Sequence, residues 1–126
     1  MYEYTENKSR ALELARQCLA AEGESLEPLL VYVFEDGNEE AHDDELQEKL
    51  ESEFYQLWLA TTEELNQTFG RGATHELSWD GGIDWIPLNG IGGASSWDTD
   101  QGRLWLAYAH EDRETPFLLM IGKACP

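Results

Sequence analysis

Basic residues, cysteines and long apolar runs are all scarce in this chain. Only 8 lysines and arginines oppose 26 aspartates and glutamates among 126 residues, and they do not cluster, so no basic surface for nucleic acid or anionic lipid is predicted. The two cysteines, Cys18 and Cys125, form no C-x-x-C pair and define no disulfide framework. We expect free thiols, with a disulfide between these two as the alternative. No run reaches the ~18 apolar residues of a membrane span.

Catalytic and metal-binding signatures are missing as well. His42, His75 and His110 lie in different segments without the spacing of a zinc site, and the chain has no G-x-S-x-G motif and no phosphate-binding loop with its lysine. Residues 1–4 do not begin a basic region followed by an apolar core, as a secretory signal would. These absences predict a cytoplasmic protein that is not an enzyme and holds no cofactor or metal.

Aromatic residues, by contrast, are plentiful. Five Trp, five Tyr and four Phe in a chain that is 41% apolar can offset the entropy of ordering, so we expect one folded domain over residues 1–126. The charge is unevenly distributed, with 18 acids and 4 bases in residues 1–70 but 8 acids and 4 bases in residues 71–126. The first half therefore carries most of the acidic character.

Helical periodicity dominates residues 1–70. Apolar or small residues recur at helical spacing over residues 5–22, ahead of a stop at Gly23, and a short apolar run over residues 29–34 predicts an interior strand. A second helix starts near Glu40. The sequence does not determine where this helix ends. Thr61 begins a capping-box signature, so a separate short helix could run from there to a stop at Gly70. Between the two helices, residues 54–60 also fit a strand.

Turn residues and short apolar segments alternate after Gly70, which is typical of a β-meander. We predict strands near residues 74–79, 83–88, 94–98, 103–110 and 116–121, with Pro87 limiting the second and the fourth placed centrally because both its faces are apolar. The predicted fold class is α+β, with two or three helices packed on a mainly antiparallel sheet of about five or six strands.

The most distinctive segment is residues 35–53, which holds ten carboxylates and one base, Lys49. Acids in a first helical turn complement the helix dipole. Farther along, Glu48 forms like-charge pairs with Asp44 and Glu51, each costing about 0.2–0.5 kcal/mol, and Glu45–Lys49 is the single compensating pair. The helix face is either merely solubilising or it binds a partner. The predicted partner-binding residues are Glu39, Glu40, Asp43, Asp44, Glu48 and Glu51.

A second candidate site lies among the turns of residues 71–126. Residues 92–96 are predicted as a loop or bulge between strands, and tryptophans near it could wall a ligand pocket. Residues 98–102 depart from a calcium loop and fit a hairpin turn with Gly102 in the left-handed region. The predicted pocket residues are Asp80, Asp84, Trp85, Trp97 and Asp98.

An acidic field of this density attracts basic surfaces and repels nucleic acid. We therefore expect a small acidic inhibitor that binds and occludes a basic protein partner, a toxin or nuclease-like enzyme, without contacting nucleic acid or a membrane. In composition the chain is similar to bacterial immunity proteins and to phage-encoded inhibitors that mimic nucleic acid. The alternatives are a ligand-binding or enzymatic domain using the pocket, and a structural interaction domain with a solubilising face. The oligomeric state is open.

Overall fold

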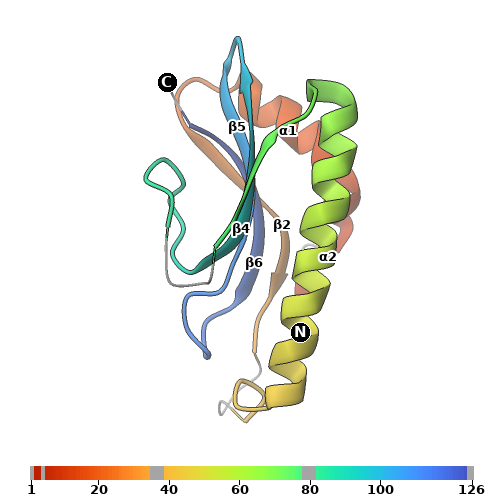
Figure 1. The fold of residues 1–126 in the computed structure, drawn as a ribbon, viewed down its shortest axis with the longest axis vertical. Helices are drawn as coiled ribbons and strands as arrows, with labels where there is room; N and C mark the ends of the chain where they lie inside the picture. The colour runs from red at the N-terminus through yellow and green to blue at the C-terminus, as the bar shows by residue number, and fades with distance from the viewer. Residues whose placement is uncertain (1, 4, 35–38, 78–81, 125–126) are drawn as a thin grey trace.

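The computed structural model describes residues 2, 3, 5–34, 39–77 and 82–124 (Figure 1). Two helices pack on an antiparallel sheet, so the predicted α+β class is confirmed. The elements in chain order are β1 (Tyr2–Glu3), the 3₁₀ helix η1 (Thr5–Arg10), α1 (Ala11–Ala20), β2 (Ser25–Tyr32), α2 (Asp44–Phe69), β3 (Ala73–Glu76), β4 (Ile91–Thr99), β5 (Gly102–Ala109) and β6 (Phe117–Ala124).

The strands form one sheet in the order β1-β2-β6-β5-β4-β3, with every neighbouring pair antiparallel. Five strands make up the body of the sheet, and the two-residue β1 extends one edge. The strand β3 forms the other edge, and in Figure 1 this segment runs in front of the other strands. The strand β5 lies between β6 and β4, as its two apolar faces predicted.

Both helices cover the same face of the sheet (Figure 1). Side chains alternate across a strand, so every second residue of β5 and β6 points toward the helices. Phe54 and Trp58 of α2 and Phe117 of β6 are almost completely buried in this layer. The layer also encloses Cys18, a free thiol that is 2% exposed; burial raises its pKa, whereas Cys125 lies outside the described residues.

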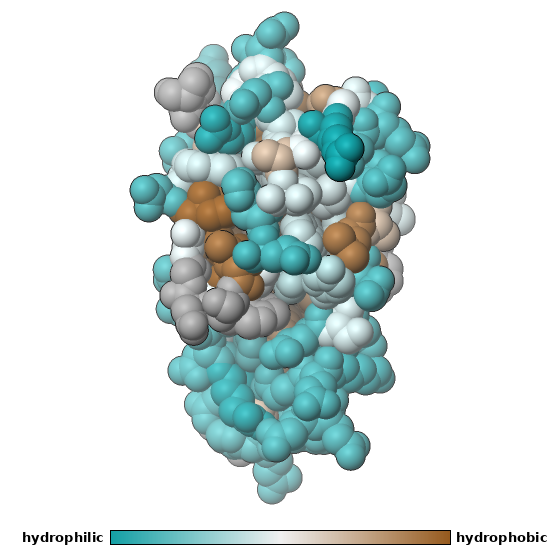
Figure 2. Space-filling view, viewed as in Figure 1, coloured by the Kyte–Doolittle hydropathy of each residue, from teal (hydrophilic) through white to brown (hydrophobic). Residues whose placement is uncertain are grey.

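The opposite face of the sheet has no helix among the described residues. It is covered in part by the segment between β3 and β4, whose Ile86 packs with Trp105 and Ala107 of β5. In Figure 2, apolar atoms appear at the left beside this segment, whereas hydrophilic atoms cover the lower part of the molecule, where Figure 1 places the N-terminal part of α2. Within the described residues, no helix is both long and apolar enough to cross a membrane.

The structure corrects several strand predictions. Residues 83–88 form a turn rather than a strand, since the amide of Ile86 donates to the carbonyl of Ile83 at 2.9 Å. Pro87 has no backbone N–H that could donate to a neighbouring strand. Residues 92–96 were predicted as a loop or bulge. They lie inside β4, which includes the predicted strand over residues 94–98, so the loop is wrong, but the register of β4 does have an irregularity of the bulge type between Ile91 and Gly93. The strand predicted over residues 29–34 starts earlier, because β2 begins at Ser25 and includes Pro28, beside a second irregularity in strand register.

The second helix is also longer than its internal signals suggested. It runs without interruption from Asp44 to Phe69, so neither the strand over residues 54–60 nor a separate helix after Thr61 forms. The stop at Gly70 is confirmed, and this residue has a positive φ of 85°. The predicted start near Glu40 is wrong because residues 39–42 form a turn. Thr61 and Thr62 are instead buried, and the Thr62 hydroxyl is 2.8 Å from that of Ser95 in β4.

Candidate functional site

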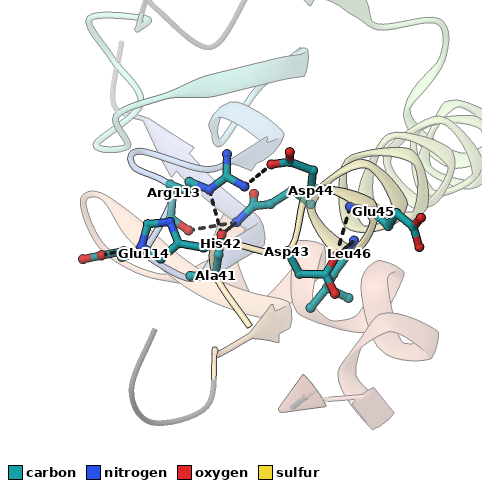
Figure 3. Close-up of polar contacts among 9 residues, drawn as sticks. Ala41, His42, Asp43, Asp44, Glu45, Leu46, Arg113 and Glu114 are labelled. Atoms are coloured by element: carbon teal, nitrogen blue, oxygen red, sulfur yellow. Dashed lines mark hydrogen bonds and ion pairs between the residues drawn. The ribbon is translucent and has the colours of Figure 1, made fainter. Parts of the chain in front are cut away.

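The acidic end of α2 begins with an N-cap. The carboxylate of Asp43 accepts hydrogen bonds from the backbone amides of Glu45 and Leu46 at 3.0 and 3.2 Å, so it satisfies donors that have no partner inside the helix (Figure 3). Replacing such a cap by alanine costs about 0.5–2 kcal/mol. Asp43 therefore has a structural role that accounts for its position.

The turn between β5 and β6 is attached to this end of the helix. Arg113 in that turn donates from Nε to the carbonyl of Ala41 at 2.9 Å and forms an ion pair with Asp44 (Figure 3). The side-chain amide of Gln47, which is 8% exposed, donates to the carbonyls of Ala41 and Arg113 at 2.8 and 2.9 Å. The carboxylate of Asp44 is thus occupied by a base of the same chain.

The turn before the helix is held in a similar way. The hydroxyl of Tyr32 donates to the carboxylate of Glu40 at 2.7 Å, and the amide of His42 donates to the backbone carbonyl of Glu39 at 3.2 Å. The ring of His42 lies 3.3 Å from the carboxylate of Glu114 (Figure 3). Glu40 is half-buried and internally bonded, whereas the side chain of Glu39 is exposed.

Glu48 and Glu51 differ from the acids that precede them. Both side chains are exposed, and no hydrogen bond or ion pair joins either one to another described residue. Partial burial, and next the charge of Glu48, raise the pKa of the Glu51 carboxyl. The base Lys49 pairs with Glu53 at 3.9 Å rather than with Glu45 as predicted. The sequence-predicted set therefore divides into three acids that cap the helix or are internally bonded (Glu40, Asp43 and Asp44) and three outward carboxylates, which are Glu39 in the preceding turn and the helix residues Glu48 and Glu51.

One carboxylate that sequence reasoning missed, Glu76 in β3, continues this acidic surface onto the sheet. Tyr55, one helical turn after Glu51, donates from its hydroxyl to the carboxylate of Glu76 in β3 at 3.0 Å. Burial raises the pKa of Tyr108 in β5 to about 12, and the carboxylates of Glu76 and Glu51 add to this shift. The i,i+4 spacing to Glu51 could have indicated Tyr55. No local signal connects Glu76 to the helix, because their contact depends on how α2 crosses the sheet.

The raised pKa of Glu51 predicts a pH-dependent effect of Glu51→Gln on stability. A carboxyl whose pKa is higher in the folded state destabilises the fold once it ionises, and this cost disappears below pH ~4.5, where it is protonated in both states. We expect Glu51→Gln to stabilise the protein at pH 7 by about 0.2–0.5 kcal/mol. The gain should vanish at pH 3.5, as measured by urea midpoints. Glu63→Gln, at another exposed position of α2, is the control, and an equal gain at both pH values would contradict the argument.

The second predicted site is only partly assembled. Trp85, Asp98 and Arg103 line a cavity of about 500 Å³ at the β4–β5 turn, where the Arg103 guanidinium lies 4.8 Å from the Trp85 ring centre and its Nε is 2.8 Å from Asp98. Trp97 is not part of this cavity. It is adjacent to Asp98 in β4, so it points to the helix face, where its indole donates to the side chain of Asn66 at 2.9 Å.

The remaining pocket residues do not complete a ligand site. Asp84 is exposed in the turn over residues 83–88 and does not line the cavity, and Asp80 lies outside the described residues. The predicted hairpin turn after Asp98 is confirmed, with Gly102 at a positive φ of 133° and the Thr99 hydroxyl donating to the Gly102 carbonyl at 2.8 Å. Across the described ranges, no three His, Cys, Asp or Glu side chains gather as metal ligands would.

The comparisons with known proteins add no relative to this description. No family model matches the chain, and no curated protein or solved structure matches it. The functional interpretation therefore depends on the geometry and charge of the described residues.

Proposed function

We propose that this chain is a small acidic protein that binds and occludes a basic partner protein in the cytoplasm, in the manner of an immunity protein or antitoxin that neutralises a toxin or nuclease. The observation that carries the proposal is the pair of outward carboxylates, Glu48 and Glu51. They lie close enough for like-charge repulsion, and no base of the described chain compensates them. A positively charged surface would relieve this repulsion.

The support beneath these carboxylates is rigid. The start of α2 is held by its Asp43 cap and by Arg113, and its inner side is buried through Leu50 and Phe54. A preformed helix loses little conformational entropy on association, so more of the electrostatic attraction contributes to affinity. Complementary charge also raises the rate of encounter and disfavours wrong partners.

Affinity capture from native lysate tests the proposal. The wild-type protein, immobilised at low salt, should retain a basic protein that a high-salt wash releases, because contacts between exposed charges are screened within about 10 Å at 0.1 M salt. A second column carries the Glu48→Lys/Glu51→Lys variant, and mass spectrometry compares the two eluates. Capture of the same proteins by both columns would show that α2 is only a solubilising face of a structural interaction domain.

A second candidate function is a small-ligand site at the Trp85 cavity. The observation in its favour is the indole ring beside both Arg103 and Asp98, since an aromatic wall with a few polar groups is typical of ligand pockets. A ligand at a hundred times its dissociation constant should stabilise the fold by about 2.7 kcal/mol. Thermal unfolding with a panel of metabolites and metal ions therefore tests this function, and unchanged midpoints across the panel would count against it.

A further inference from the structure

The edge strand β3 has the properties of a strand that accepts another. It pairs only with β4 among the described residues, and all four of its side chains are exposed. Natural edge strands are commonly protected by short length, charged side chains (lysine above all), proline or a bulge. The strand β3 is only four residues long and carries the acidic Glu76, but it contains no proline or lysine, and its register with β4 is regular. A negative charge disfavours acidic segments and leaves the edge open to basic ones.

The hydrogen-bond pattern shows which backbone groups of this edge point outward. The amide of Leu77, just after β3, donates to the carbonyl of Gly92 at 2.9 Å. Bonded and non-bonded positions alternate in an antiparallel ladder, so the amide and carbonyl of Thr74 and Glu76 point away from β4. The amide of Gly72, on the same alternation, donates instead to the side chain of Asn66 in α2 at 3.0 Å. The Gly72 amide thus points away from β4, as assigned for Thr74 and Glu76.

A groove accompanies this edge along its helix side. It has a volume of about 460 Å³ and lies between α2 and the start of β3, with Leu59, Glu63 and Thr74 in its wall. Leu59 is 39% exposed, and apolar atoms are visible over this part of α2 at the right of Figure 2. Residues 74 and 76 of β3 face the helix side, as the contact between Glu76 and Tyr55 shows. An added strand would therefore place every second side chain beside α2.

The charge around the groove is mainly negative, which favours a basic segment as its occupant. Glu63 lies in the groove wall, Glu76 ends the edge strand, and Glu48 and Glu51 continue the acidic surface along the helix, whereas Arg71 is the one base in the groove wall that the structure describes. Alternate basic residues of an extended segment would meet these carboxylates. Its backbone would satisfy the outward groups of β3.

We propose that β3 binds an extended, lysine- or arginine-rich segment of the partner as an added strand, with alternate basic side chains directed at Glu63 and Glu76. This inference rests on the proposed function for the nature of the partner. It goes further by assigning part of the contact to backbone hydrogen bonds at a sheet edge, in addition to the charge attraction of the helix face.

A peptide of alternating character tests the strand addition. The probe is the octapeptide TKVKTKVK, and its matched control carries the same charge but has its four central backbone nitrogens methylated. At physiological salt, the probe should shift the amide resonances of Thr74 and Glu76 in the ¹⁵N-labelled protein, and methylation should weaken its binding about tenfold or more, because the inter-strand hydrogen bonds are lost. The variant Thr74→Pro should weaken binding in the same way, whereas Thr74→Ala should not.

The other outcomes overturn the inference without deciding the proposed function. Equal binding of both peptides, with shifts confined to the Glu48 and Glu51 region, would mean attraction by charge alone. Absence of binding by either peptide at millimolar concentration would exclude strand addition. The peptide comparison uses the unaltered protein, so it remains decisive if Thr74→Pro does not fold. The proposed function is judged separately, by lysate capture on wild-type and charge-reversed columns.

Discussion

Reversing Glu48 and Glu51 to lysine is expected to slow association with the basic partner about 10-fold or more at low salt, because electrostatic steering changes encounter rates by about 10–10³-fold. Both side chains are exposed and have no bonded partner in the described chain, so the fold should survive the change. The measurement is the association rate of the captured partner by stopped-flow or surface plasmon resonance over a series of salt concentrations. The difference between wild type and variant should shrink as salt increases.

A matched control separates local charge from net charge. The control variant Glu22→Lys/Glu24→Lys changes the net charge by the same amount, and both of its residues are exposed. They follow α1, whose last turn is hydrogen-bonded by Lys123 at the C-terminal end of β6. The acidic start of α2 lies at the other end of β6, because Arg113, which pairs with Asp44, is in the turn just before β6 begins. This control should alter the rate much less. Equal slowing by the two variants would mean that total charge, and not the α2 face, drives the encounter.

Adding a single methyl group at Gly93 is expected to destabilise the fold by about 1–3 kcal/mol. A Cβ atom at this position would lie 2.7 Å from Cε1 of Tyr108 and 2.9 Å from Cζ3 of Trp58, and both rings belong to the buried layer under α2. The rings would have to move within a close-packed core. Urea unfolding of Gly93→Ala measures the loss.

Gly82→Ala serves as the matched control for Gly93→Ala. Among the residues that the structure describes, a Cβ atom there would meet only the carbonyl of Leu88, at 3.7 Å, which is an ordinary contact. Gly82→Ala should therefore not destabilise the fold, and it should increase the free energy of unfolding by up to about 1 kcal/mol because alanine restricts the unfolded chain. If both variants unfold at the same urea concentration, the two aromatic rings do not depend on the absence of a side chain at residue 93.

Gly93 also illustrates where sequence reasoning went wrong. A glycine-rich run such as residues 89–93 is typical of irregular backbone, so residues 92–96 were predicted as a loop or bulge between strands. In the fold Gly92 and Gly93 both lie in β4, and the aromatic side chains of α2 and β5 occupy the space that a side chain at residue 93 would need. Local pattern cannot distinguish a glycine needed for a turn from one needed for close packing.

For the predicted sites, too, local inferences were correct and inferences about distant contacts were not. The acidic character and the helical placement of Glu48 and Glu51 followed from spacing, because residues three and four apart share a helix face. That Asp44 is paired did not follow, since Arg113 comes from a turn 69 residues away. The proposed pocket required Trp97 and Asp98 to act together, yet adjacent strand residues point to opposite faces of a sheet.

The sequence by itself determined the α+β class, the central β5 strand, the helical placement of the acidic segment and the stop at Gly70. Each of these depends on periodicity, capping or composition within a short window. Only the tertiary structure decided which acids are paired, which face each tryptophan occupies, and that β3 is an exposed edge beside Leu59 and Glu63. The physical reason is that ion pairing, burial and edge position depend on contacts between segments far apart in the chain.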